Sequence, residues 1–161
     1  LLTFGLKEKL NAEAYKVILH EQEIKRQQIA NSILKSVPMP KTHMRLVDTM
    51  KLAYKLCTEQ SDVFCREIFA DKMMDELRTA GKIFILVCRE NLPFETGVNE
   101  IEKKLNYAAA SLAQISELEL WNTEKCMSLA GLITETLAEM LAERKMVEKM
   151  VKSGKLKICM K

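Results

Sequence analysis

Apolar residues recur at steps of three or four along most of this 161-residue chain, the spacing that places them on one face of an α-helix. The pattern is clearest near the end, where steps of four and three alternate as in antiparallel bundles and coiled coils. That seam consists of Cys126, Ala130, Ile133, Leu137, Met140, Arg144, Val147 and Val151. We therefore expect an all-α protein, either an irregular helical bundle or a short helical solenoid of five to six helices, with no substantial sheet.

The chain opens with one long helical segment. Helical spacing predicts a helix over about 6–36, but its middle, residues 20–28, carries Ile24 as its one apolar residue. A helix with so little apolar face gains little from packing. We expect this stretch to be solvated nearly all round or covered by something outside the chain.

Two prolines separate that helix from the remainder. Pro38 and Pro40 end it because each removes an amide donor and pushes the preceding residue out of the helical region. We expect residues 1–36 to form a long N-terminal helix that packs on a partner, and residues 41–161 to form the bundle core of a single domain.

Two shorter helices follow the prolines. The first covers about 41–57 and is broken by the polar stretch 58–62. Ser61 or Asp62 is suited to cap the second, because either side-chain oxygen can accept from a free backbone amide. The apolar residues of the second helix are Phe64, Ile68, Phe69, Met73 and Leu77. Gly81 is expected to close it as the residue just past its last turn.

The next region is less regular. Residues 82–88 have the length and β-branching of a buried strand, which periodicity cannot distinguish from a short buried helix. We favour the helix, because a lone strand would have only the tail at 155–161 to pair with. Residues 91–97 contain proline and glycine and predict a loop.

Capping residues mark the last two helices. Asn99, with Glu102 three residues later, is a variant of the capping box and predicts a helix start. Asn122 or Thr123 caps the final long helix, and Gly154 ends it.

Cysteine usage indicates a reducing compartment. The cysteines are odd in number, lie among apolar neighbours and include no CxxC pair, whereas secreted disulfide scaffolds are denser in cysteine and usually even in count. They are Cys57, Cys65, Cys88, Cys126 and Cys159. We expect a cytoplasmic protein with free thiols, with the nucleus as an open alternative.

The sequence lacks the patterns of catalytic and cofactor sites. His20 and Glu21 begin like the HExxH zinc motif, but Ile24 stands where the second histidine should be. The other histidine, His43, lies in a different segment, and the five glycines never fall at the spacing of a phosphate-binding loop. We therefore expect no enzyme, no cofactor and no metal site.

Composition is that of a folded segment outside the membrane. With 48% apolar and 29% charged residues the chain does not match a disordered sequence, and its longest uncharged apolar run, residues 83–88, is six residues long. The chain starts with Leu and has no secretory signal pattern. We expect it to be part of a larger protein.

Charge is unevenly distributed, although the net charge is only +3. Residues 81–143 carry five basic and ten acidic side chains, a net of −5, whereas residues 144–161 carry seven basic and one acidic, a net of +6. Acidic residues early and basic residues late in the last helix complement its macrodipole, which is a sufficient explanation. A docking patch for an acidic protein or a phosphate backbone is the alternative. Its candidate residues are Lys145, Lys149, Lys152, Lys155 and Lys157.

Two aromatic residues stand outside the helical seams. Phe94 lies in the expected loop and Trp121 at the expected turn before the last helix. Either ring could close the core from a loop or, if exposed, anchor a partner. Both are therefore candidate interaction residues.

We interpret the chain as a non-catalytic intracellular protein–protein interaction or scaffolding module. Its partner is expected to be another protein bound by helix–helix packing, and self-association is a further expectation. The alternative is a nucleic-acid-binding helical protein that uses the basic C-terminal segment. The small net charge favours the first interpretation.

Overall fold

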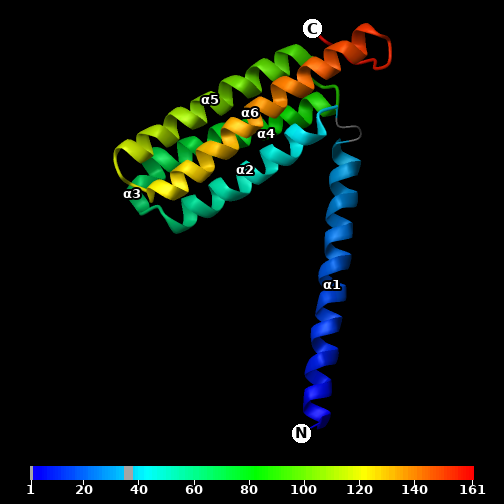
Figure 1. The fold of residues 1–161 in the computed structure, drawn as a ribbon, viewed down its shortest axis with the longest axis vertical. Coiled ribbons are helices and arrows are strands. Elements are labelled where there is room, and N and C mark those ends of the chain that lie inside the picture. Colours follow the sequence, from blue (N-terminus) through cyan, green and yellow to red (C-terminus); the bar gives the residue numbers. More distant parts are fainter. Residues whose placement is uncertain (1, 35–37) are drawn as a thin grey trace. The chain divides into compact units, whose positions relative to one another are not determined.

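The computed structural model describes residues 2–34 and 38–161, and every regular element in these ranges is helical. A short helix α3 (Val63–Cys65) and a π-helical turn η1 (Arg66–Ala70) lead into the fourth helix. The long helices are α1 (Leu2–Leu34), α2 (Pro40–Glu59), α4 (Asp71–Cys88), α5 (Phe94–Glu117) and α6 (Thr123–Lys152) (Figure 1). The all-α helical fold is therefore confirmed, and residues 82–88 are helical.

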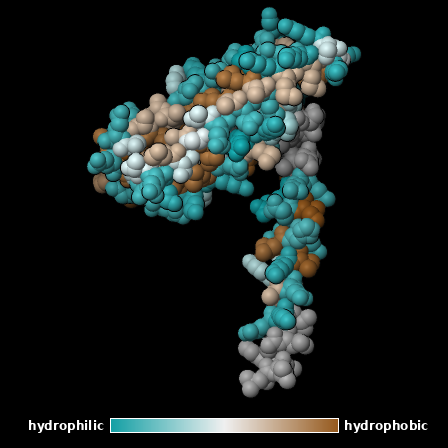
Figure 2. All heavy atoms as spheres, in the orientation of Figure 1, coloured by the Kyte–Doolittle hydropathy of each residue, from teal (hydrophilic) through white to brown (hydrophobic). Residues whose placement is uncertain are grey.

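The chain divides into two compact units, Leu1–Ser36 and Val37–Lys161. In the first, α1 is a single helix, and every side chain described between Glu8 and Ile29 is exposed (Figure 2). The large apolar side chains among them are 41–63% exposed, and they are Tyr15, Val17, Ile18, Leu19, Ile24 and Ile29. Helices draw most of their stability from a buried face, and the side chains described in α1 provide none within its own unit. Ser36, the expected end of this helix, lies outside the described residues.

The second unit is a four-helix bundle. Helix α2 packs against α6 and α4, α5 packs against α4 and α6, and short connections join consecutive helices (Figure 1). Contact is most extensive between α4 and α5 and least extensive between α2 and α4. The α2–α4 side is thus the most open side of the bundle.

Large apolar side chains from all four helices fill the core. Each one that is fully buried contributes about 1.5–3 kcal/mol relative to exposure. The largest are Phe84, Phe94, Met39, Leu56, Met73, Leu77, Ile101, Leu105, Ile115, Leu129, Ile133 and Met140. They recur at three- and four-residue steps, so the periodicity that predicted the helices also marks their buried faces.

Two buried polar pairs set the register between α2 and α6. Thr42 pairs with Glu143, and the Thr49 hydroxyl lies 3.1 Å from the Thr136 hydroxyl. Each step of seven residues along α2 matches a step of seven in the opposite direction along α6, which is the heptad spacing of an antiparallel helix pair.

Two glycines lie inside helices, contrary to the sequence prediction. Gly81 was expected to end a helix, but α4 continues through it to Cys88. A Cβ at Gly81 would stand 3.0 Å from the Met50 sulfur. Gly97 was expected in a loop, but it lies in the second turn of α5, where a Cβ would collide with Val87 of α4. Both glycines serve close helix approach rather than a turn.

The prediction for the start of α5 was also wrong. The helix begins at Phe94, five residues before the expected cap at Asn99. Pro93 precedes it and provides no side-chain cap. The free amides of Phe94 and Glu95 instead donate to the Cys159 and Met160 carbonyls, at 2.8 and 3.0 Å. The C-terminal tail therefore completes this helix start, which local sequence cannot reveal.

The π-helical turn changes which residues before α4 are buried. Cys65 and Ala70 are buried five residues apart, and normal spacing resumes at Met73. The extra residue in this turn rotates the preceding side chains away from the core. Phe64 is therefore 75% exposed and Ile68 51% exposed, although both belong to the apolar residues of this segment.

Three of the predicted helix boundaries are confirmed. The Asp62 carboxylate accepts from the Cys65 amide at 2.7 Å, and the Asn122 side chain accepts from the amides of the first turn of α6. Gly154 follows the end of α6 with a φ of +76°, the left-handed conformation of a residue just past a helix.

Candidate interaction groove between α2 and α4

An apolar groove of about 250 Å³ lies on the open side of the bundle. Two helices line it, α2 with His43, Leu46, Val47 and Met50, and α4 with Arg78, Gly81, Lys82, Phe84 and Ile85. The α2 residues that face it recur at steps of three and four, so the groove follows one face of that helix.

The floor of the groove is apolar and well packed. Met50 fits over Gly81, where the absence of a Cβ leaves it room. The His43 ring stacks on Phe84 with a centroid distance of 5.4 Å and an interplanar angle of 25°. Burial lowers the pKa of His43, because a charged imidazolium is poorly solvated there. The imidazole is therefore neutral at pH 7.

The charged residues that line the groove are both basic. The Arg78 guanidinium is bonded to Asp75 on the same helix, an exposed pair of small energetic value. Lys82 is exposed and takes part in no salt bridge among the described residues. Lys82 is therefore the basic residue of the rim whose charge no salt bridge offsets within the described residues.

The lining of the groove offers mainly apolar contact area. Besides the imidazole of His43, which is neutral and can accept a proton, the groove-lining residues carry no hydroxyl, thiol or carboxylate. An apolar floor with a few polar groups at its edge instead accepts apolar anchor side chains.

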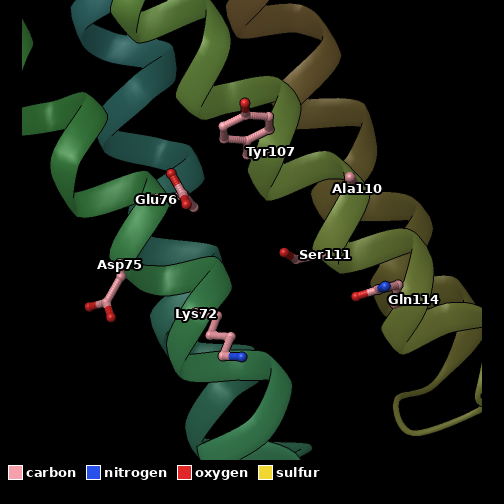
Figure 3. Close-up of a pocket in the computed structure, with 7 residues that line it drawn as sticks. All are labelled: Lys72, Asp75, Glu76, Tyr107, Ala110, Ser111 and Gln114. Carbon is pink, nitrogen blue, oxygen red and sulfur yellow. The ribbon is translucent and has the colours of Figure 1, made fainter.

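A second hollow, of about 400 Å³, lies between α4 and α5 and is polar (Figure 3). Ser111 and Gln114 of α5 point toward the gap, whereas Asp75 points away from it. The Glu76 carboxylate pairs with Lys104 at 3.3 Å, and no hydrogen bond joins Ser111 to a base among the described residues. We see no reactive pair in this hollow.

The two candidate aromatic residues are buried. Phe94 is 1% and Trp121 4% exposed, so both close the core, the first of the two alternatives drawn from sequence. The Trp121 indole nitrogen donates to the Ser61 hydroxyl at 2.8 Å, and the Asn122 amide donates to the Gln60 side chain at 3.3 Å. Trp121 therefore joins the α2–α3 and α5–α6 connections and does not present a surface anchor.

The candidate lysines Lys145, Lys149, Lys152, Lys155 and Lys157 are all exposed, on the last turns of α6 and the tail. None forms a salt bridge within the described ranges. They do not line the groove. The groove was not predicted from the sequence, because its lining residues occupy ordinary positions in the helical pattern of apolar residues. The one local signal was Gly81, which lies inside a helix.

The remaining candidate groups do not converge. Four cysteines are buried as free thiols and Cys159 is exposed. Among residues 2–34 and 38–161 no three His, Cys, Asp or Glu side chains are placed to hold a metal. Within the same ranges no helix has the length and apolar character needed to cross a membrane.

No protein-family model, curated protein or solved structure matches the chain.

Proposed function

We propose that the protein is a non-catalytic helical interaction module whose α2–α4 groove binds an amphipathic partner helix with acidic flanks. The observation that carries this proposal is the combination of an apolar floor with a rim whose charged residues, Arg78 and Lys82, are both basic. Apolar anchors of the partner would fill the floor, and carboxylates beside them would meet the rim. A reducing compartment such as the cytoplasm suits this role, since all five cysteines are free.

A designed probe tests the proposal directly. The probe is a fluorescent helical peptide about five turns long, with Leu at i, i+3, i+4 and i+7 and Glu on both flanks. A second peptide keeps the leucines but carries Lys on the flanks. We expect the first to bind and the second to bind at least about tenfold more weakly. Equal binding of the two peptides would refute the charge complementarity.

Matched variants locate the binding surface. Ile85→Asp places a charge in the groove, whereas Met44→Asp places one on an exposed position of α2 that does not line it. We expect the first to weaken the Glu-flanked peptide about tenfold or more and the second to leave its affinity within about twofold. Lys82→Glu should reverse the preference between the peptides. Binding that tolerates Ile85→Asp in a folded variant would place the peptide elsewhere.

The exposed basic segment supports a second candidate function, nucleic-acid binding. It holds seven basic and one acidic side chain in residues 144–161. Changing Lys145, Lys149 and Lys152 to Gln would then weaken RNA or DNA binding and reduce its dependence on salt by up to about three units. If these lysines only complement the helix dipole, the change should alter stability by less than about 1 kcal/mol and affect no nucleic-acid binding.

A further inference from the structure

The two ends of the bundle carry opposite charge. We define the acidic end as residues 59–71 and 117–125, where seven acidic side chains against two basic ones leave −5. The basic end, residues 144–161, has seven basic and one acidic side chain, or +6. Helix α6 runs from the first to the second, with Glu124 in its first turn and Lys149 and Lys152 in its last (Figure 1). At 1.5 Å per residue this separation is about 45 Å.

Neighbouring elements do not cancel the charge of the basic end. The starts of α2 and α5 and the end of α4 lie at the same end of the bundle. Their charged residues are Lys41, Arg89, Glu90, Glu95 and Glu100, a net of −1 against the +6 of residues 144–161. The tail is also fixed, because its carbonyls at Cys159 and Met160 accept from the first amides of α5. The basic side chains therefore project from an ordered surface.

Both ends also expose large apolar side chains. At the acidic end, Phe64 is the most exposed large apolar residue of the bundle, because the π-helical turn rotates it outward. Figure 2 shows apolar residues at the surface of this end. The exposed apolar residues there are Val63, Phe64, Ile68 and Leu118, with Met127 two residues beyond, and those at the basic end are Met146 and Met150. Each end thus offers apolar contact area inside a field of one sign.

We propose that the bundle associates head to tail, the acidic end of one copy docking on the basic end of a second copy. Like charges at matching ends oppose a symmetric pairing of two acidic or two basic ends. The contact joins two different surfaces, so each added copy leaves one acidic and one basic end free and the assembly can continue. It does not use the α2–α4 groove and is independent of the proposed function.

Sedimentation velocity of the full chain over a concentration series tests the proposal. We expect the mean sedimentation coefficient to rise with concentration at low salt. Association should be largely lost at about 1 M salt, where the screening length is about 3 Å. A wild-type coefficient independent of concentration at low salt would overturn the proposal.

Charge reversal at each end tests whether the acidic end of one copy meets the basic end of another. Lys149→Glu with Lys152→Glu lowers the net charge of the basic end from +6 to +2, and Glu67→Lys with Glu119→Lys changes that of the acidic end from −5 to −1. We expect each double variant alone to be monomeric at concentrations where wild type associates, and an equimolar mixture of the two to associate again. Recovery in the mixture also shows that both variants are folded.

A control on the sides of the bundle matches the change in net charge. Lys51→Glu with Lys103→Glu alters two exposed lysines in the middle of α2 and α5. This variant should associate like wild type. Association that survives in both end variants, or a mixture that stays monomeric, would overturn the head-to-tail mode.

Discussion

The Glu143 carboxylate of α6 caps the start of α2 through Thr42. One carboxylate oxygen accepts from both the backbone amide and the hydroxyl of Thr42, at 2.5 and 2.8 Å, and the other accepts from the Lys41 amide at 3.2 Å. Met39 precedes the helix and offers no side-chain cap, so a residue 101 positions away satisfies amides that a local cap usually serves. Glu143 is 7% exposed and lies where the positive end of the α2 dipole favours a negative charge.

Removing this carboxylate should destabilise the bundle. Glu143→Ala leaves two amides and a hydroxyl without their acceptor, which we expect to cost about 2–3 kcal/mol in free energy of unfolding. Glu143→Gln keeps one acceptor oxygen and should cost less. Urea unfolding measures both. Glu139→Ala is the control, because the Glu139 side chain is on the same helix and forms no hydrogen bond or salt bridge within the described residues. Equal losses at the two positions would contradict the cap.

Two helical glycines should respond to alanine in opposite ways. Gly97→Ala drives a Cβ into Val87 and should destabilise the bundle by about 1–3 kcal/mol. Gly131, in α6, has nothing within 4 Å of a Cβ, so Gly131→Ala should stabilise by about 0.5–1 kcal/mol through helix propensity. Thermal unfolding followed by circular dichroism compares them. Adding Val87→Ala to Gly97→Ala should recover part of the lost stability. If Gly97→Ala leaves the melting temperature unchanged, α4 and α5 can move apart at this point.

These glycines show why sequence predicted the elements better than their contacts. Helical periodicity depends on residues within one segment, so α2 and α6 were predicted as helices, whereas α4 was predicted as two segments that part at Gly81. Whether Gly81 ends a helix or admits Met50 depends on a residue of another helix. The same holds for the start of α5, which the tail completes, and for the burial of Trp121, which depends on Ser61.

The site was less predictable than the fold for a related reason. The groove exists because α2 and α4 pack least closely, and no single residue encodes that spacing. The exposure of Phe64 depends on one extra residue in a π-helical turn, which leaves the apolar pattern looking like an ordinary helix. The exposed lysines of the C-terminal segment were recognisable, since their charge is local to the sequence.

Thiol reactivity should separate one cysteine from the others. Burial raises the pKa of Cys57 and of Cys88 to about 11, so almost no thiolate is present at pH 8, and burial also raises the pKa of Cys126. Cys159 is exposed and should react first with a maleimide. Mass spectrometry of the intact protein should show one rapid addition and the remaining additions only after unfolding. Rapid labelling of Cys57 or Cys88 in the folded state would contradict their burial.

Acidification should weaken the bundle through His43. Its folded pKa lies below the ordinary value of about 6.5, whereas in the unfolded chain the imidazole titrates near that value. As pH falls below about 6.5 the unfolded chain binds a proton that the folded chain does not, so stability falls until the folded pKa is passed. The folded pKa is lowered because the ring is partly buried and stacks on Phe84, where a charged imidazolium is poorly solvated.

A pair of histidine variants isolates this effect from the titration of carboxylates. His43→Gln cannot be protonated, so its free energy of unfolding should fall less than that of wild type between about pH 7.5 and 5.5. His20→Gln changes an exposed residue of α1 and should follow the wild-type curve. Urea unfolding at several pH values gives the two differences. If His43→Gln and wild type lose the same free energy of unfolding over this range, the imidazole of His43 is protonated as readily in the folded bundle as in the unfolded chain, which would contradict the prediction.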